Sequence, residues 1–116
     1  MTHPTQRLDN AVHQRTRLGI LTVLAGAERV DFTYLRDALQ LSDGNLSRNV
    51  SVLETAGYLS VTKTFEGRRP RTWIAVTQAG RAALDGEIQA LREIVQAVER
   101  DRPRLSDVGE AEAAPS

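Results

Sequence analysis

The sequence predicts a mainly α-helical chain with one small antiparallel β-hairpin, an α+β fold that ends in a long helix. Three observations predict it. Apolar residues recur at helical spacing through residues 8–55. Residues 58–76 hold two alternating segments rich in β-branched side chains, with Glu66-Gly67 between them. Over residues 84–98, apolar positions then step by four, three, four and three.

Capping residues divide residues 8–57 into three helices. The first is expected from about Leu8 to Ala25, where apolar side chains form a stripe. Asp31 is a good N-cap for the second helix, because its carboxylate can accept hydrogen bonds from the free N–H groups of the first turn. Ser42 can cap the third helix in the same way, and Gly57 can end it in a left-handed conformation.

A helix pair joined by a tight turn and followed by a hairpin is the element order of a winged helix-turn-helix. The expected strands are residues 58–64 and 72–76, and Pro70 suits an edge or loop position. In such an arrangement the third helix can enter the major groove of DNA while the hairpin, or wing, contacts the backbone or minor groove. The element order therefore points to a small DNA-binding transcriptional regulator.

The chain is expected to end in a long helix and a tail. Thr77 opens the helix, which we expect to end near Arg100 because Asp101-Arg-Pro follows. Residues 102–116 are acidic and lack apolar periodicity, so we expect them to form a disordered tail. Residues 1–101 then form a single domain, too small to include a separate sensor domain.

Composition argues against several classes of function. The chain has no cysteine, which removes disulfides and thiolate metal sites, and only two histidines, so neither a metal site nor a cofactor is expected. No apolar run approaches the ~20 residues of a membrane helix, and the N-terminus lacks a signal peptide, so a cytoplasmic location is expected. Without a phosphate-binding glycine loop, clustered catalytic acids or a nucleophile–base pair, an enzyme is not expected.

The net charge is zero, but the charges are unevenly distributed. Residues 1–84 carry eleven basic and seven acidic side chains, a net of +4, whereas residues 85–116 carry four and eight, a net of −4. Because phosphates are neutralised locally, a basic patch matters more for DNA affinity than the total charge does. Overall neutrality therefore argues against unspecific coating of nucleic acid and not against a specific site.

The third helix carries the residues expected to contact bases. One of its faces is apolar and points to the core, and the opposite face is small and polar. The candidate DNA-binding residues of this helix are Ser42, Gly44, Asn45, Ser47, Arg48 and Ser51. Arg48 could donate two hydrogen bonds to a guanine, and Asn45 could pair with adenine or a phosphate. Ser47 and Ser51 are expected to hold phosphates. The alternative for all six residues is that they form an ordinary solvated helix face that contacts no DNA.

The hairpin concentrates positive charge near its tip. The candidate DNA-binding residues there are Lys63, Arg68, Arg69 and Arg71. The alternative is pairing with Glu66 and solvent, but one glutamate cannot neutralise four cations, so a polyanion is the favoured partner. We expect Arg69 or Arg71 to enter a narrow minor groove.

Four other residues have competing interpretations. Arg15 and Arg17, on the first helix, could approach phosphates or pair with acids of the last helix. For Trp73 we expect packing in the core rather than base stacking, because nothing else resembles a platform for single strands. Asn49 lies near the core edge of the third helix, and a structural role is expected for it.

These residues also resemble a known family. The motifs, in order, are Val12-His-Gln-Arg-Thr-Arg-Leu-Gly-Ile-Leu, Asp31-Phe-Thr-Tyr-Leu-Arg, Leu41-Ser-Asp-Gly-Asn-Leu-Ser-Arg, Leu53-Glu-Thr-Ala-Gly-Tyr-Leu and Gly67-Arg-Arg-Pro-Arg-Thr. Over about residues 8–95 they are similar to the short single-domain winged-helix regulators of bacteria and archaea, relatives of the MarR and ArsR types. The resemblance implies a homodimer whose first and last helices form the interface. Asn49 departs from it, because histidine often follows the arginine of the third helix, and the metal-binding clusters of ArsR sensors are absent.

The last helix provides most of the expected dimer interface. Its apolar spacing suits a partner helix, and the alternative is packing on the first helix of the same chain. The expected interface residues are Val12, Leu84, Ile88, Leu91, Val95 and Val98. A twofold dimer would place its two third helices roughly 34 Å apart, matching half-sites one DNA turn apart.

The sequence therefore predicts a regulator that binds specific double-stranded DNA, most simply a dimeric repressor at an inverted-repeat operator. The competing hypothesis is a winged helix that binds proteins without contacting DNA. It predicts exposed apolar residues on the third helix, where this sequence has asparagine, serine and arginine. A small-molecule effector would have to bind between the first and last helices or at the dimer interface, and regulation by protein abundance alone fits equally well.

Overall fold

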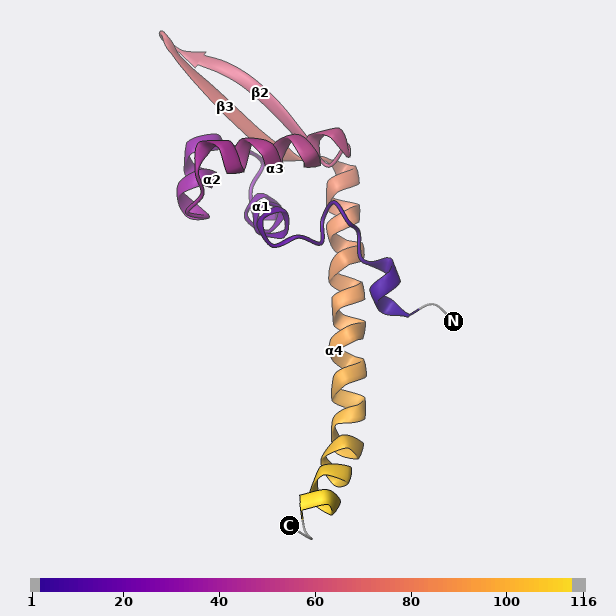
Figure 1. Ribbon diagram of the computed structural model, residues 1–116. Helices are drawn as coiled ribbons and strands as arrows, with labels where there is room; N and C mark the ends of the chain where they lie inside the picture. The colour runs from indigo at the N-terminus through magenta and orange to yellow at the C-terminus, as the bar shows by residue number, and fades with distance from the viewer. Residues whose placement is uncertain (1–2, 114–116) are drawn as a thin grey trace.

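The computed structural model describes residues 3–113, with side chains described for residues 3–102. The elements in chain order are η1 (Pro4–Arg7), α1 (Arg15–Ala25), β1 (Val30–Asp31), α2 (Phe32–Ala38), α3 (Asp43–Thr55), β2 (Leu59–Glu66), β3 (Arg69–Val76) and α4 (Gln78–Ala113). Figure 1 shows the shorter helices and the sheet gathered at one end of α4, which extends well beyond them. The predicted fold class, mainly α with a small antiparallel sheet, is confirmed.

Side-chain caps begin three helices where the sequence predicted them. Asp31 Oδ1 accepts a hydrogen bond from a backbone N–H in the first turn of α2 at 2.7 Å. Ser42 Oγ does the same for α3 at 3.1 Å, and Thr77 Oγ1 for α4 at 3.0 Å. Each cap satisfies a donor that has no partner inside the helix.

The first helix is shorter than predicted, because α1 begins at Arg15 and not near Leu8. Asp9 Oδ1 accepts from the backbone N–H of Ala11 at 2.8 Å, and this local bond turns the chain where a helix would otherwise begin. Gln14 then caps α1, its side-chain oxygen accepting from a first-turn N–H at 2.9 Å.

The sheet has three antiparallel strands in the order β1-β3-β2. β2 and β3 pair as far as Glu66 opposite Arg69, and Gly67 takes the left-handed φ of 65° that the two-residue turn requires. β1 joins the sheet by pairing Asp31 with Trp73 and Val30 with Ile74. The sequence did not predict β1, because two residues are too few to show a period.

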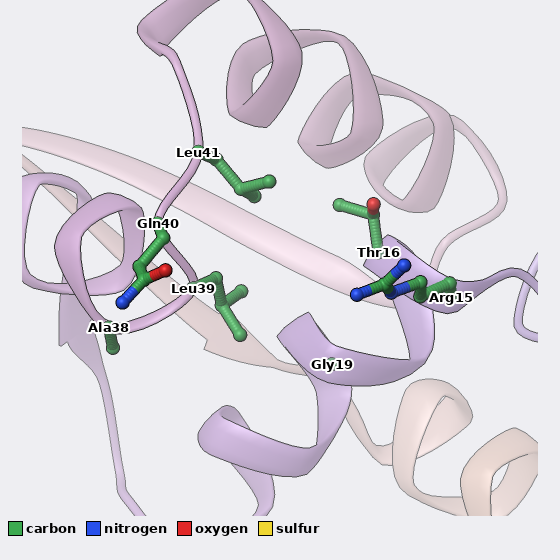
Figure 2. Close-up of a pocket in the computed structure, with 7 residues that line it drawn as sticks. All are labelled: Arg15, Thr16, Gly19, Ala38, Leu39, Gln40 and Leu41. Atoms are coloured by element: carbon green, nitrogen blue, oxygen red, sulfur yellow. The ribbon is translucent and has the colours of Figure 1, made fainter.

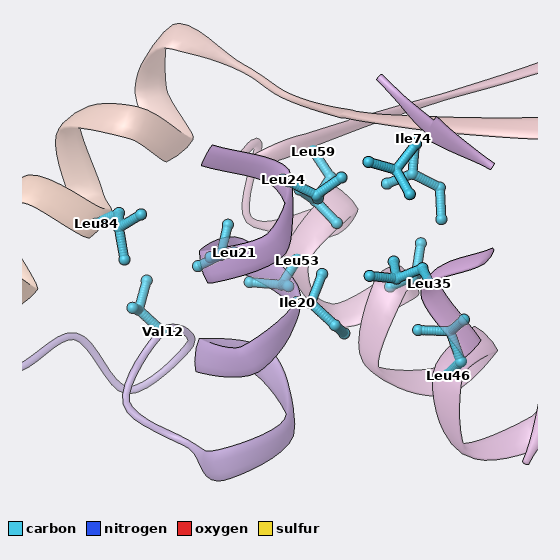
Figure 3. Packing of buried hydrophobic residues seen from close by; sticks show 12 residues of the cluster. Val12, Ile20, Leu21, Leu24, Leu35, Leu46, Leu53, Leu59, Ile74 and Leu84 are labelled. Atoms are coloured by element: carbon cyan, nitrogen blue, oxygen red, sulfur yellow. The ribbon is translucent and has the colours of Figure 1, made fainter. Parts of the chain in front are cut away.

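One apolar core lies between α1, α2, α3, the sheet and the start of α4 (Figure 3). Its buried members include Val12, Ile20, Leu21, Leu24, Leu35, Leu46, Leu53, Leu59, Ile74 and Leu84. Val12 and Leu84 had been predicted to lie in a dimer interface. Their side chains are 0% and 7% exposed within their own chain, so neither is available to a partner.

The last helix is longer than predicted. Its backbone continues through Pro103 to Ala113, so the expected end near Arg100 is wrong. Proline removes its own N–H donor and favours a kink, but it does not by itself end a helix. A disordered tail was expected over residues 102–116, whereas residues 102–113 belong to α4. Residues 114–116 lie outside the described part of the chain, and for them the disorder stays a prediction. No helix in the described part of the chain is long and apolar enough to cross a membrane.

Two glycines of α4 allow a matched test of its packing. A Cβ at Gly80 would lie 2.2 Å from the Tyr58 carbonyl oxygen and 2.8 Å from Val76 Cγ2. Gly80→Ala is therefore expected to lower the free energy of unfolding by about 1–3 kcal/mol. A Cβ at Gly86 would meet nothing within 4 Å, so Gly86→Ala should raise it by up to about 1 kcal/mol. Urea unfolding followed by circular dichroism measures both, and equal effects would contradict the close packing of α4 on the turn after α3.

Candidate nucleic-acid interface

The polar face of α3 is turned to solvent. Ser47, Arg48 and Ser51 are exposed, as are Ser42 and Gly44 at the start of the helix. A Cβ added at Gly44 would meet nothing within 4 Å, so the surface around it is open. The opposite face is the buried one, as the helical wheel predicted.

The hairpin and α3 border one groove. Ser47, Ser51 and Glu54 line it from α3, and Lys63 and Thr72 line it from the hairpin. The groove encloses about 360 Å³ above a floor of apolar core residues. The structure therefore brings two of the predicted residues of the third helix, Ser47 and Ser51, to one surface with Lys63 of the wing, with a single carboxylate, that of Glu54, among them.

The three arginines of the wing are not equivalent. Arg68 and Arg69 are exposed at the hairpin tip. Arg71 is bound to two carboxylates: its Nε donates to Asp31 Oδ2 at 2.7 Å, and its Nη1 donates to Glu66. The hydrogen bond from Arg71 lowers the pKa of Asp31, and the two carboxylates raise the pKa of Arg71. Arg71 thus joins the wing to the start of α2, a role that the sequence did not reveal.

Trp73 supports this link and does not lie in the core, so its predicted core packing is wrong. The ring is half-buried, with the guanidinium carbons of Arg29 and Arg71 at 3.9 Å and 4.5 Å from its centroid. Its Nε1–H donates to Thr64 Oγ1 at 3.1 Å. Successive side chains of a strand point to opposite faces, and the next residue, Ile74, is buried in the core, so the side chain of Trp73 lies on the other face beside the two arginines.

Arg17 does not pair with an acid of the last helix, one of the two alternatives that the sequence left open for it. Its Nε donates to the Ala11 carbonyl at 2.6 Å, and its Nη1 donates to Asn49 Oδ1 at 3.0 Å. Asn49 is 7% exposed, which confirms the structural role expected for it. Its Nδ2 donates to the backbone carbonyl of Asn45 at 3.0 Å and to Asn45 Oδ1 at 2.7 Å. A candidate base-contacting residue is thereby hydrogen-bonded to the interior of the protein.

A buried carboxylate fixes the segment before α1. Glu87 of α4 is 1% exposed, its Oε2 lies 2.6 Å from His13 Nδ1, and its Oε1 accepts from the Asp9 backbone N–H at 3.1 Å. Asp9 Oδ2 in turn accepts from the Tyr58 hydroxyl, which lowers the pKa of Asp9. The segment is thus tied both to α4 and to the start of the hairpin.

The apolar stripe of α4 divides into a buried and an exposed part. Ile88, Val95 and Val98 are 37%, 53% and 51% exposed, and Leu91 is half-buried. With Arg92 and Gln96 beside it, the stretch from 88 to 95 forms a shallow, mainly apolar groove. This part of the predicted interface remains available to a partner.

A separate cavity of about 640 Å³ lies between the start of α1 and the turn joining α2 to α3 (Figure 2). Arg15 and Thr16 of α1 face Gln40 of the turn across it. Its place differs from the expected effector position between the first and last helices. Among the described residues, no group of three His, Cys, Asp or Glu side chains could hold a metal ion.

Known proteins resemble this chain in sequence and in fold. The family described as "winged helix DNA-binding domain" matches residues 16–95. An uncharacterized protein of Methanocaldococcus jannaschii, MJ0432, is 34% identical over 83 residues, covering 72% of this chain and 90% of that protein. The resemblance to winged-helix regulators that the sequence indicated is thus confirmed.

Three solved structures illustrate the likeness in fold. A transcriptional regulator homologue from Pyrococcus horikoshii OT3 aligns with a TM-score of 0.77 at 24% identity, covering 84% of this chain and 98% of its own. The M. tuberculosis regulator MosR, solved in complex with DNA, aligns with a TM-score of 0.64 at 22% identity, covering 97% of this chain and 86% of its own. A MarR-family regulator from Rhodococcus sp. RHA1 aligns with a TM-score of 0.61 at 18% identity, covering 98% of this chain and 84% of its own.

The link between Asp31 and Arg71 predicts a pH-dependent stability. The folded state lowers the pKa of Asp31 below its ordinary 3.8, so the link stabilises the protein above about pH 4 and its contribution is lost as the pH falls through the lowered pKa. Asp31→Asn keeps a good helix cap but loses the charge. Its melting temperature should lie below that of the wild type at about pH 7, and the difference should shrink as the pH falls below 3.8 and through the lowered pKa.

Asp85→Asn, at an exposed position of α4, is the matched control and should track the wild type throughout this range. A constant difference between Asp31→Asn and the wild type down to low pH would show that the charge of Asp31 does not stabilise the fold.

Proposed function

We propose that this chain, which belongs to the family of winged helix DNA-binding domains, is a transcriptional regulator that binds a specific sequence of double-stranded DNA. The observation that carries the proposal is the common surface of α3 and the hairpin, where Ser47, Ser51 and Lys63 line one groove. Such a surface suits a duplex, because a helix fits the major groove while a basic hairpin fits the adjacent backbone or minor groove. A regulator of this kind would act at the chromosome, in keeping with the cytoplasmic location expected from the sequence, and no enzymatic role is proposed.

Within this surface, α3 carries the base contacts. Arg48 is exposed and has no carboxylate partner among the described residues, so its guanidinium is available to donate two hydrogen bonds to a guanine. Ser47 and Ser51 are exposed on the side of the hairpin, where hydroxyl groups can hold phosphates. Open space around Gly44 lets the backbone of α3 approach the duplex closely.

In the wing, Arg68 and Arg69 take the contact with DNA and Arg71 does not. The two tip arginines are exposed, whereas Arg71 would have to give up Asp31 and Glu66 to reach a groove. Of the two minor-groove candidates from the sequence, Arg69 is therefore the one we retain. Arg71 supports it by keeping the hairpin fixed against α2.

We further propose that α4 forms a homodimer through Ile88, Leu91, Val95 and Val98, and that the dimer represses transcription at an inverted-repeat operator. An exposed apolar stripe on a helix is stabilised when a second copy covers it, and a twofold pair presents two α3 helices to successive turns of one DNA face. Binding near a promoter would then exclude polymerase. Any effector would act by changing the spacing between the two α3 helices.

The DNA contacts predict different effects for two sets of arginines. Arg48→Ala should weaken binding to the preferred duplex by roughly 5- to 150-fold while relaxing one base position. Replacing both Arg68 and Arg69 by alanine should weaken binding to all duplexes and reduce the dependence of log affinity on log salt by about two. Fluorescence anisotropy at several salt concentrations measures both.

Replacing both Arg100 and Arg102 by alanine is the control, because both are exposed on α4, outside the groove between α3 and the hairpin, and the change removes the same two charges. Equal losses for this control and the wing variant would show that only net charge matters. Salt-independent weak affinity of the wild type, together with tight binding to a protein, would favour a protein-interaction module instead.

The dimer is tested on α4 alone. Ile88→Asp and Val95→Asp place charges in the exposed apolar stripe and should convert a dimer into a monomer in sedimentation equilibrium. Gln89→Asp adds the same charge to an exposed position on another side of the helix and should leave the dimer intact. A wild-type monomer at all measured concentrations would rule out the dimer while leaving the DNA contacts open to the previous test.

A further inference from the structure

The amide of Asn49 has its orientation fixed at one end by Arg17. The guanidinium is bound to the backbone carbonyl of Ala11 by Nε at 2.6 Å and to that of Asn10 by Nη2 at 3.4 Å, while Nη1 reaches Asn49 at 3.0 Å. A guanidinium can donate hydrogen bonds and cannot accept them. The amide atom of Asn49 that faces Arg17 must therefore be its oxygen.

The other end of the same amide is fixed independently. It lies 3.0 Å from the backbone carbonyl oxygen of Asn45, and a carbonyl oxygen can only accept. The atom there must be the nitrogen, Nδ2. Asn49 is buried, so no solvent is at hand to replace either bond if the amide turned over. Both neighbours thus require the same orientation.

This orientation determines that of Asn45 in turn. Asn49 Nδ2 also donates to the side chain of Asn45 at 2.7 Å, so the atom it meets there must be the oxygen, Oδ1. Because Oδ1 is directed at a buried residue, the amide nitrogen of the half-buried Asn45 is the end left for a partner outside the protein. A free asparagine could present either end, whereas Asn45 presents hydrogen-bond donors.

We propose that Arg17 and Asn49 act as positioning residues that make Asn45 a hydrogen-bond donor toward DNA, so that Asn45 selects a base with an acceptor in the major groove and rejects cytosine. Guanine offers O6 and N7, thymine offers O4 and adenine offers N7 as acceptors, whereas cytosine presents only its N4 amino group, a donor. The proposal rests on the proposed function, because it requires α3 to lie in the major groove. It replaces the expected pairing with adenine, which asks the asparagine oxygen to accept from the adenine amino group.

The test is selection of binding sites from a random duplex library by the full chain. With the wild type, bases that offer an acceptor should exceed cytosine roughly 3- to 10-fold at one position of each half-site, the range of one neutral hydrogen bond. Asn45→Ala should remove the preference at that position and at no other. Asn49→Leu, which fills similar space but leaves Asn45 free to turn over, should admit cytosine at the same position. Arg48→Ala should relax a different position and serves as the matched control.

Three results would overturn the proposal: selection of cytosine by the wild type at the position that Asn45→Ala relaxes, an Asn45→Ala effect on affinity without any change of base, or an unchanged rejection of cytosine in Asn49→Leu. The second result would mean that Asn45 holds a phosphate. Failure of the proposed function is distinguishable, because the wild type would then select no motif at all.

A second measurement needs neither DNA nor a variant. In the NMR spectrum of the wild type, the side-chain NH₂ protons of Asn49 should exchange with solvent at least roughly tenfold more slowly than those of Asn45, because only the former are hydrogen-bonded inside the protein. Faster exchange at Asn49 than at Asn45 would contradict the fixed orientation of both amides.

Discussion

The arrangement of the elements proposed to face DNA depends on Asp31. Its backbone pairs with Trp73 and so attaches β1 to the sheet, its Oδ1 caps α2, and its Oδ2 accepts from Arg71 at 2.7 Å. One residue therefore sets where the helix-turn-helix begins and how the wing lies against it. The helix-turn-helix and the wing must keep a fixed relative position if α3 is to enter a DNA groove while the wing contacts the adjacent DNA backbone. The stacking of Arg29 and Arg71 on Trp73 strengthens this junction.

A second set of hydrogen bonds connects α4 with α3 through the segment before α1. Glu87 of α4 binds the backbone of Asp9, and two carbonyls of the same segment bind Arg17, which reaches Asn49 of α3. The helix proposed to form the dimer and the helix proposed to contact bases are therefore attached to one short stretch of chain. This connection gives a physical basis for relating the association of two chains to the orientation of their α3 helices, since both are fixed by the same contacts.

Features that depend on neighbours in sequence could be predicted, and those that depend on distant partners could not. The caps Ser42 and Thr77 act within three residues, and the hairpin joins adjacent strands, so the sequence located both. The two strands continue closer to the hairpin tip than predicted, to Glu66 and from Arg69. The exposed face of α3 followed from helical period alone. In contrast, Arg71 looked like a free cation because its partner Asp31 lies 40 residues away. The roles of Glu87 and Arg17 could not be predicted either, because their partners come from other elements. The burial of Val12 could not be predicted because it depends on the turn that Asp9 makes.

The most direct test of the central claim, that α3 and the hairpin tip together form a DNA-binding surface, is an NMR titration of ¹⁵N-labelled protein with a duplex obtained by site selection. The account predicts that backbone amide shifts concentrate on the exposed face of α3 and at Arg68 and Arg69, and that they diminish as salt is added. Residues of α4 beyond Ile88 should change little once the dimer has formed. Shifts confined to α4, or none at low salt, would contradict the account.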